Sequence, residues 1–374
     1  MGESNRRAEN LADVLAAHTG LPPTWRDAFA QTPRELFVPT HAHFSNNVTE
    51  AWEIDRDTDP EAWLSSVYRP DVGVVTQMDG NTPTSSSSMP MAMAETLGAV
   101  RIFAGQKVCE IGAGTGYNAA VIAQRVGDLN MTTIEVDPDI VRKAEANLAK
   151  AGHDGVTVIH GDGLNLNGLG RFDRLVATCS VSSLPASWIE ACPRGQIFAP
   201  WFNAYDSSAS AVLDVEDGVA IGRFVPNLKY MPARAMAFSD KQPGRPTDPK
   251  LSSTWLRCPQ VTDRRKLGAA FAIGAQLPDV FKLGTTDRSL GTTTVTLWDG
   301  QGSWARTSTP ASMEVAQYPV EQAGPRDLWD EVEQAYRRWR SWGRPSTDRF
   351  GLTSDGETFT IWLDNADQPI SDLP

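Results

Sequence analysis

The stretch VCEIGAGTGYNAAVIA, residues 108–123, constrains the fold of this chain more than any other segment. An apolar run leads into Gly112, Gly114 and Gly116, and a helix-like run of small and apolar residues follows them. A strand, a glycine turn and a helix in this order bring bare backbone amides and a helix N-terminus against a ligand. The stretch therefore predicts a close-fitting site for a ligand with a polar or anionic group.

Strand-like and helix-like runs alternate around this stretch. The strand-like runs are KVCEIG, MTTIEV, VTVIHG, FDRLVATC and GQIFAPW, and the helix-like runs between them are YNAAVIAQRVG, DPDIVRKAEANLAKAG and SSLPASWIEACP. Such an alternation is typical of a parallel sheet with helices on both faces. The predicted fold class is α/β, with a doubly wound, Rossmann-like sheet that SASAVLDVED and VAIGRFV are expected to close near residue 235.

The segments before residue 100 carry weaker patterns. Residues 8–40 are expected to be helical up to RELFVP, whereas residues 41–84 are polar and are expected to be irregular, with DRDTDPEAW as a solvent-facing insertion. The run SSSSMPMAMAETLGAV predicts a serine-rich loop and then a helix with Pro90 in its first turn.

The alternating pattern ends near residue 235, which predicts two domains, residues 1–235 and a C-terminal α+β extension of residues 236–374. The extension contains a strand-like TTTVTLWDG, a helix-like DLWDEVEQAYRRWRSWG and a strand-like ETFTIWLD. In the expected helix one stripe is apolar, and Gly343 with Pro345 ends it. The stripe consists of Leu328, Val332, Ala335 and Trp339. Most of the tryptophans after residue 235 are expected to form the extension's core.

Charge and apolar content exclude several classes of protein. The formal net charge is −12, which disfavours nucleic-acid binding, because such proteins gain affinity by neutralising phosphates. No run approaches the ~18 apolar residues of a membrane span, and MGESNRRAEN lacks the apolar core of a signal peptide. We therefore expect a cytoplasmic protein with no membrane partner.

The cysteines and histidines do not predict a metal centre. Cys109, Cys179, Cys192 and Cys258 have no CxxC spacing, which indicates reduced, mostly buried thiols. His41 and His43 form an H-x-H pair in THAHF, but no nearby carboxylate or third ligand is evident in the sequence. We expect two loop histidines and no metal site.

The glycine spacing distinguishes between two ligand classes. A nicotinamide dinucleotide usually requires G-x-G-x-x-G, but here the third glycine comes one residue early and Tyr117 stands in the last glycine's place. The spacing and Glu110 favour a nucleoside that carries an amino acid, with Glu110 meeting its cationic end directly or through the turn amides. A nicotinamide-dependent dehydrogenase and a non-enzymatic peptide-binding module remain the alternatives.

Two further acidic residues follow strand-like runs and complete this interpretation. Glu135 ends the next run, where a carboxylate accepts hydrogen bonds from both ribose hydroxyls. Asp162 in VIHGDG is suited to accept a hydrogen bond from an adenine amino group, and Gly163 leaves room for the ring.

These motifs resemble a known family. EIGAGTG, IEVDPD, HGDG and FDRLVAT resemble the S-adenosylmethionine-dependent methyltransferases, and RELFVP, AGHDGVTVIHGDG and GRFVP resemble the protein-L-isoaspartate O-methyltransferases over roughly residues 10–235. The resemblance implies S-adenosylmethionine as the cofactor. The cofactor-binding residues that it implies are Ser86, Glu110, Gly112, Gly114, Gly116, Tyr117, Glu135, Asp162 and Gly163.

The same resemblance implies a methyl-transfer site. The family carries a T-x-S-x-P-like element, whose spacing Ser86, Ser88 and Pro90 match, although TPTSSSSMP departs from the usual residues around it. A carboxylate acceptor is already ionised at neutral pH, since the unperturbed pKa of Asp is about 3.9, so no general base is required. Ser88 is therefore expected to be the catalytic residue, as a hydroxyl that positions the acceptor.

The extension indicates a specialised branch of the family. The chain resembles homologues that tailor ribosomally made peptides such as lanthipeptide, lasso-peptide or graspetide precursors, and the closing DRFGLTSDGETFTIWLD is similar to that group. This resemblance implies methylation of an aspartate in a cyclised peptide, followed by loss of methanol to give aspartimide and then, on hydrolysis, isoaspartate. The alternative is repair of L-isoaspartate in damaged proteins.

The extension is also expected to bind the peptide substrate. Residues 223–266 hold ten lysines and arginines against three aspartates, unlike the acidic whole, and Arg264, Arg265 and Lys266 end this run. A second basic cluster consists of Arg337, Arg338, Arg340 and Arg344. The alternative is a solvated face with internal ion pairs.

Overall fold

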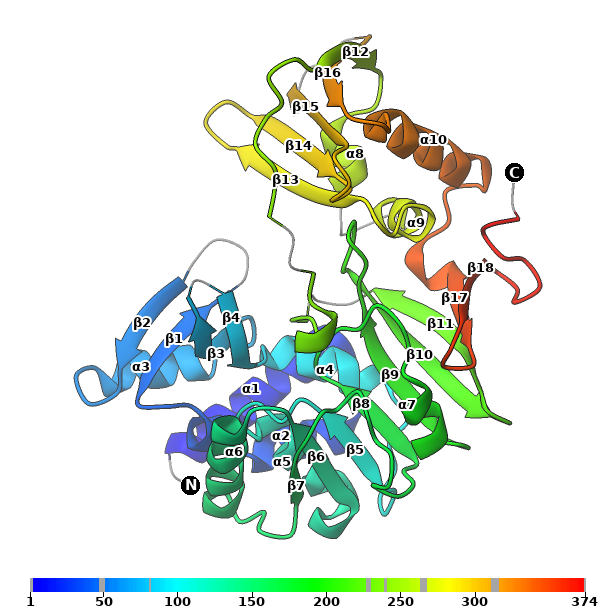
Figure 1. Ribbon diagram of the computed structural model, residues 1–374. Coiled ribbons are helices and arrows are strands. Elements are labelled where there is room, and N and C mark those ends of the chain that lie inside the picture. Colours follow the sequence, from blue (N-terminus) through cyan, green and yellow to red (C-terminus); the bar gives the residue numbers. More distant parts are fainter. Residues whose placement is uncertain are drawn as a thin grey trace.

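The computed structural model describes residues 3–46, 51–80, 82–226, 230–238, 241–262, 268–310 and 316–372. The described part of the chain contains three sheets with helices packed against them (Figure 1). A nine-stranded sheet lies at the centre, a four-stranded sheet lies beside it, and a five-stranded sheet lies above it in the view of Figure 1.

The nine-stranded sheet has the order β18-β17-β11-β10-β9-β8-β5-β6-β7. Its strands are β5 (Val108–Ile111), β6 (Met131–Glu135), β7 (Thr157–His160), β8 (Arg174–Ala177), β9 (Gln196–Trp201), β10 (Ala209–Glu216), β11 (Val219–Pro226), β17 (Phe350–Ser354) and β18 (Phe359–Leu363). The strands from β9 to β7 in this order run parallel, whereas the remaining pairs are antiparallel. The predicted doubly wound α/β fold is confirmed.

One expectation about this sheet is wrong, because it does not close near residue 235. Strand β17 pairs with β11, with Arg223 opposite Gly351, and β18 pairs with β17. The sequence before residue 235 contains no signal for this pairing, since the partner strand follows more than a hundred residues later.

Helices cover both faces of the sheet because its parallel strands are apolar on both sides. Val108 packs into one hydrophobic cluster, while Cys109 and Ile111 pack into another on the opposite face. The first face carries α1 (Glu3–Thr19), α2 (Pro23–Gln31), α4 (Pro90–Ala99), α5 (Tyr117–Val126) and α6 (Pro138–Lys150). The opposite face carries α7 (Ala186–Ala191) and helices of the extension. Short 3-10 turns are η1 (Arg34–Phe37), η2 (Asp128–Asn130), η3 (Arg234–Met236) and η4 (Thr347–Arg349).

The segment expected to be irregular folds into the four-stranded sheet, with the order β2-β1-β3-β4. Its elements are β1 (His41–Ser45), β2 (Ala51–Asp55), α3 (Pro60–Val67), β3 (Gly73–Asp79) and β4 (Thr82–Ser87). Phe44, Trp63 and Val74 pack into a small core of their own. The expectation of an irregular segment is therefore wrong, because alternate residues of these short strands are buried while their neighbours are polar.

Three local expectations in this region are wrong in whole or in part. The run DRDTDPEAW faces solvent at residues 57–61, as expected, but it is not an irregular insertion, since Asp59 caps α3 and Trp63 is buried. Serines expected in a loop lie on β4, although α4 does begin at Pro90 as predicted. His41 and His43 lie on β1 rather than in a loop, and β1 pairs with β2 so that Glu53 lies opposite His43.

The extension contains an antiparallel sheet with the order β12-β16-β15-β14-β13. Its elements are β12 (Lys250–Thr254), α8 (Cys258–Thr262), α9 (Ala269–Gln276), β13 (Phe281–Asp287), β14 (Thr292–Trp298), β15 (Trp304–Pro310), β16 (Tyr318–Ala323) and α10 (Leu328–Ser341). The predicted apolar stripe of α10 is buried, and the helix ends shortly before Gly343, whose φ is +84°. Five of the seven tryptophans after residue 235 are buried, as expected: Trp298, Trp304, Trp329, Trp339 and Trp362.

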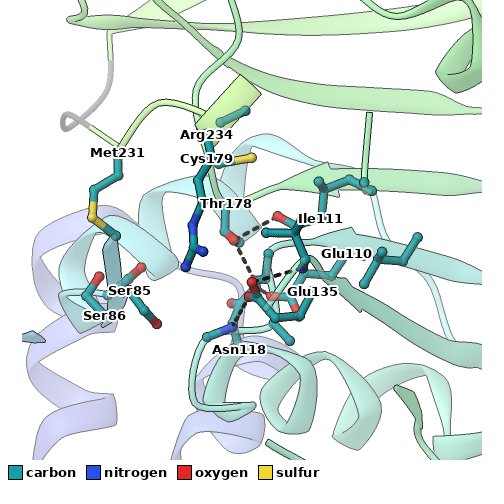
Figure 2. A pocket seen from close by; sticks show the side chains of 18 of the residues that line it. Ser85, Ser86, Glu110, Ile111, Asn118, Glu135, Thr178, Cys179, Met231 and Arg234 are labelled. Atoms are coloured by element: carbon teal, nitrogen blue, oxygen red, sulfur yellow. Dashed lines mark hydrogen bonds between the residues drawn. The ribbon is translucent and has the colours of Figure 1, made fainter. Parts of the chain in front are cut away.

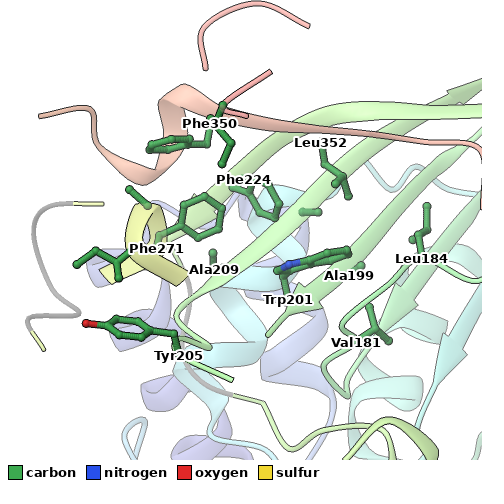
Figure 3. Packing of buried hydrophobic residues seen from close by; sticks show 14 of the residues in the cluster. Val181, Leu184, Ala199, Trp201, Tyr205, Ala209, Phe224, Phe271, Phe350 and Leu352 are labelled. Carbon is green, nitrogen blue, oxygen red and sulfur yellow. The ribbon is translucent and has the colours of Figure 1, made fainter. Parts of the chain in front are cut away.

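The extension shares a hydrophobic core with the central sheet. Phe271 of α9 lies between Phe224 of β11 and Phe350 of β17, with ring centroids 4.6 and 5.2 Å apart (Figure 3). One continuous cluster therefore joins the sheet to α8, α9 and α10. The domain division at residue 235 stays a prediction.

The described part of the chain contains no helix with the length and apolarity needed to cross a lipid bilayer. The four cysteines are free thiols, and all but Cys179 are buried, as predicted.

Candidate functional site

The predicted site residues meet at the carboxyl ends of the central parallel strands. Strand β5 lies between β6 and β8, so the chain winds away from it in two directions, and ligands of open α/β sheets bind at such a position. A cavity of about 280 Å³ opens there. The predicted residues that line it are Ser86, Ser88, Glu110, Gly112, Gly114, Tyr117, Glu135, Asp162 and Gly163. Gly116 does not line it and instead precedes α5 as its N-cap residue.

The three glycines of the turn are required by the protein's own packing. All have positive φ, and a Cβ at Gly112 would lie 2.7 Å from the Thr178 hydroxyl oxygen. A Cβ at Gly114 would lie 2.7 Å from the backbone carbonyl oxygen of Ser86. The turn is thus in close contact with the end of β8 on one side. On the other side it contacts residues 85–88, which are called the serine segment.

Glu110 is fully buried at the end of β5, below the glycine turn. One carboxylate oxygen accepts a hydrogen bond from Asn118 at 2.7 Å (Figure 2), and the other accepts one from Thr133 at 2.6 Å. Burial raises the pKa of Glu110 to about 7, even though both hydrogen bonds favour the charged form. The carboxylate therefore has partners within the protein, and Asn118, which the sequence did not single out, also lines the cavity.

Glu135 connects the end of β6 to the glycine turn. One carboxylate oxygen accepts a hydrogen bond from the Gly114 amide at 3.2 Å, and the other accepts one from the Val136 amide at 3.0 Å. Lone pairs of both oxygens remain for hydroxyl donors. The predicted ribose contact fits this position and stays a prediction.

Asp162 and Gly163 lie at the cavity wall beyond β7. The Asp162 carboxylate accepts a hydrogen bond from the Leu164 amide at 2.9 Å and is exposed. A Cβ at Gly163 would lie 2.4 Å from the Ile111 side chain, so this glycine is required for packing against β5. The apolar side chains of Ile111 and Leu164 offer a surface for a flat ring there.

Tyr117 contributes more to the core than to the cavity. Its ring lies 5.4 Å from that of Phe37, and it is buried. Burial raises the pKa of its hydroxyl, and that oxygen has no hydrogen-bond partner among the described residues. The predicted cofactor contact of this residue is therefore restricted to the part of the side chain at the cavity wall.

A buried arginine fixes the serine segment, and sequence reasoning missed it. Arg34 of η1 is fully buried and donates hydrogen bonds to the backbone carbonyl oxygens of Val67, at 2.7 Å, and Ser88, at 3.0 Å. Burial lowers its pKa to about 10. The two charged residues of RELFVP, Arg34 and Glu35, stand directly before an apolar run, and this was the available signal, since burying a guanidinium requires partners.

A polar cluster at the cavity rim was also missed. Met231–Ala235 line the cavity, and Arg234 reaches into it from the side opposite Glu110 (Figure 2). Arg234 donates to Gln77 at 2.8 Å and to Asp137 at 3.3 Å, while Gln77 donates to Asp137 at 2.8 Å. The Gln77 hydrogen bond, more than any other contact, lowers the pKa of Asp137, to about 2. These contacts join β3, the start of α6 and η3 across the rim.

Comparison with known proteins identifies the family. The family described as protein-L-isoaspartate(D-aspartate) O-methyltransferase (PCMT) matches residues 8–235. The chain belongs to this family. The family prediction is thus confirmed, and the predicted enzyme class and S-adenosylmethionine as the methyl donor agree with this family.

Individual relatives cover the chain less completely. A protein-L-isoaspartate O-methyltransferase of Methanococcus aeolicus is 41% identical over 99 residues, which are 26% of this chain and 46% of that protein. Protein-L-isoaspartate O-methyltransferase 2 of Archaeoglobus fulgidus is 29% identical over 199 residues, which are 52% of this chain and 78% of that protein. The chain thus spans about half the length of the first of these relatives.

A solved structure extends the likeness to the region after residue 235. A structure titled protein-L-isoaspartate O-methyltransferase aligns with 96% of this chain and 100% of its own, with a TM-score of 0.55 and 19% identity. At this identity the likeness concerns the fold alone. The region after residue 235 thus falls largely within the part of the chain that aligns with this structure.

The pKa of Glu110 predicts how stability depends on pH. A carboxyl group whose pKa rises from 4.5 to about 7 on folding binds more protons in the folded state, so it destabilises the ligand-free protein as pH rises through this range. Glu110→Gln should reduce the loss of unfolding free energy between pH 5 and pH 8 by up to ~3 kcal/mol. Urea denaturation at both pH values measures this.

Exposed Glu357 supplies the control for that experiment. Glu357→Gln should leave the pH dependence of stability as it is in the unsubstituted chain. An equally steep pH dependence in Glu110→Gln would show that Glu110 ionises normally in the folded protein.

Proposed function

We propose that this chain transfers a methyl group from S-adenosylmethionine to a side-chain carboxylate of an aspartyl or isoaspartyl residue. The observation that carries the proposal is the chemistry of the cavity wall. None of the described residues lining the cavity is a histidine or a lysine, and burial raises the pKa of the lining Cys179 to about 12. An acceptor that needs no general base, such as a carboxylate, suits this wall.

The acidic residues of the wall suit a cationic ligand with hydroxyl and amino donors. In the proposed arrangement Glu135 accepts hydrogen bonds from the ribose, Asp162 accepts one from the adenine amino group, and Glu110 acts on the amino-acid end through Asn118. Ser86 lies between these groups and the acceptor side. The bound cofactor supplies a methyl group on a sulfonium, and the protein supplies its placement and the exclusion of water.

Ser88 is the proposed positioning residue for the acceptor carboxylate. Arg34 donates a hydrogen bond to the backbone carbonyl oxygen of this serine. The backbone that carries the hydroxyl is therefore held in position. Met231 and Pro232 line the cavity as apolar groups that limit access of water.

Ser88→Ala should lower kcat/KM for the peptide by ~10- to 100-fold, because a hydrogen bond to a charged group is worth roughly 1.5–3 kcal/mol. The affinity for S-adenosylhomocysteine, measured by calorimetry, should not change. Exposed Ser65 on α3 provides the control, and Ser65→Ala should change neither value. Full activity of Ser88→Ala would place the acceptor elsewhere.

For the acceptor we propose, more narrowly, an aspartate of a cyclised, ribosomally made peptide. The departure of TPTSSSSMP from the usual residues beside Ser88 supports this, because the segment faces the substrate. The second candidate is repair of L-isoaspartate in proteins, which agrees with the names of the relatives. The extension does not distinguish the tailoring function from the repair function, because a structure titled protein-L-isoaspartate O-methyltransferase aligns with 96% of this chain.

Product masses separate the two candidates. On a cyclised precursor peptide with an aspartate in its ring, the tailoring function predicts a gain of one methyl group followed by loss of methanol. In that second step the next backbone amide nitrogen attacks the ester carbonyl, and methanol leaves. On a generic linear isoaspartyl peptide the repair function predicts methyl-ester turnover, and efficient turnover there, with no reaction on the cyclised peptide, would overturn the tailoring proposal.

The extension is proposed to help bind the peptide, and aromatic contacts support this more than charge does. Arg264, Arg265 and Lys266 lie outside the described residues. Within the described part, Lys250 pairs with Asp327 at 2.7 Å, which favours the internal ion-pair alternative for this residue. Arg337 and Arg340 of the second cluster lie over the Trp255 ring at 5.7 and 5.6 Å.

Phe238 offers a more direct connection between the cavity rim and the extension. It follows the rim segment that contains Arg234, is 47% exposed, and lies between Phe202 and Phe281 at ring separations of 5.2 and 5.3 Å. Phe281 in turn stacks on Trp298. An exposed aromatic side chain at this position suits the apolar part of a peptide.

Phe238→Ala should raise KM for the peptide several-fold through lost apolar contact, at ~25 cal/mol per Å², and leave cofactor affinity unchanged. Steady-state kinetics and calorimetry measure the two effects. Phe103 is the control, because it is 56% exposed and precedes β5, at the opposite edge of the sheet from the cavity. An unchanged KM in Phe238→Ala would remove this residue from the docking surface.

A further inference from the structure

A second group of ligand-type side chains lies on the four-stranded sheet, outside the cavity. His41 and His43 are two residues apart on β1, so both imidazoles lie on the same face of the sheet. Glu53 and Asp55 lie directly opposite them on β2, with His43 paired to Glu53 and His41 to Asp55. Four potential ligand side chains therefore lie next to one another on one face of the β1–β2 hairpin.

The intervening residues explain why this face presents its polar groups together. Ala42 and Phe44 point into the small core on the other face of β1. The neighbouring Arg56 lies over the Trp63 ring of that core, at 5.5 Å, and donates to Thr40. This guanidinium is thus directed away from the two histidines.

The distances within the group match a metal centre. Glu53 Oε1 lies 3.0 Å from His43 Nδ1, and Glu53 Oε2 lies 3.4 Å from His41 Nε2. One ligand atom from each of the three residues can be chosen so that all three lie within 4.8 Å of one another. Two ligands on a tetrahedral zinc ion, each at ~2.0–2.1 Å from it, are about 3.3 Å apart. The two measured separations are close to this value before any adjustment of the side chains.

Asp55 completes the arrangement as an outer partner. It lies 3.7 Å from Nδ1 of His41, which is the ring nitrogen that does not face Glu53. A histidine that binds a metal through one nitrogen usually donates its other N–H to a carboxylate, which fixes the tautomer and the ring orientation. The four side chains thus divide into three ligands and one group that orients a ligand.

We propose that His41 Nε2, His43 Nδ1 and Glu53 form a binding site for a divalent cation of the zinc class, with Asp55 as the neighbouring carboxylate that orients the His41 ring. Two imidazoles and one carboxylate are a donor set for Zn²⁺ and exclude the all-oxygen preference of Mg²⁺ and Ca²⁺. A fourth position remains for water or for a carboxylate from a bound molecule. The site does not depend on the proposed methyl transfer.

The position of the site connects it to the cavity through the sheet. Val75 of β3 lies opposite His43 and also opposite Ser86 of β4. His43, Val75 and Ser86 therefore stand in one cross-strand row, and two strand spacings put the His43 and Ser86 backbones ~10 Å apart. A cation at the histidines would lie on the same face of the sheet as the side chains of Val75 and Ser86.

Zinc titration of the untagged full chain tests the proposal, with ZnCl₂ as the probe and a chromophoric chelator as the competitor. We expect one equivalent of zinc to bind, with affinity lowered at least tenfold in His41→Ala and in His43→Ala. Asp55→Asn should lower the affinity by a smaller factor. His18→Ala is the control, because His18 lies on α1 and bonds to the Val14 carbonyl oxygen, and it should not change the affinity.

Other histidines and cysteines of the described residues can be separated from this group in the titration. Burial raises the pKa of all four thiols, and His153 is buried beside Asp128. Equal zinc affinity in His43→Ala and the unsubstituted chain, or failure of the unsubstituted chain to compete with the chelator, would overturn the proposal. Circular dichroism of each variant shows that a loss of affinity does not come from unfolding, since the substituted side chains are exposed.

Discussion

The close packing of the glycine turn after β5 is the constraint on which the site depends. Gly114 has room for no side chain because the Ser86 carbonyl oxygen occupies that space, and Gly112 has none because of Thr178. The turn is therefore in contact with β8 and with the serine segment at once. Since Glu135 also binds the Gly114 amide, the position of one loop determines both sides of the cavity.

Arg34 extends this constraint to the N-terminal sheet. A buried guanidinium without a carboxylate partner is costly unless backbone carbonyls accept its hydrogen bonds. Here the carbonyls of Val67 and Ser88 do so, and they belong to the end of α3 and the end of the serine segment. The four-stranded sheet is thus attached to the cavity wall through the same residue that fixes the proposed acceptor position.

The sequence predicted the parallel part of the fold well because its signals are local. Each parallel strand there is a short apolar run, and the helices between them, such as α6 with its Asp137 cap, carry their own start signals. The four-stranded sheet was missed because its strands alternate buried and polar residues over short runs, as in THAHF. The pairing of β17 with β11 was missed because nothing local specifies a partner so distant in sequence. For the same reason Arg234 could not be placed beside Asp137. Glu53 could not be placed beside His43 because the pairing of β1 with β2 was not predicted.

The acidic side chains that line the cavity and the arginine at its rim have different surroundings. Glu110, Glu135 and Asp162 lie at the strand ends, and burial keeps the pKa of Glu110 near neutrality in the ligand-free protein. A cationic group beside such a carboxylate favours its charged form, so binding of a cation and ionisation of Glu110 support each other. Arg234 lies at the rim, held by Asp137 and Gln77, where it is 43% exposed and faces an approaching acceptor. Because Asp137 offsets its charge, Arg234 acts at the rim through its hydrogen-bond donors, and the acids lie beyond it on the side proposed for the methyl donor. The proposed sites for the two substrates thus differ in their polar groups, with carboxylates on the proposed methyl-donor side and a paired guanidinium at the rim.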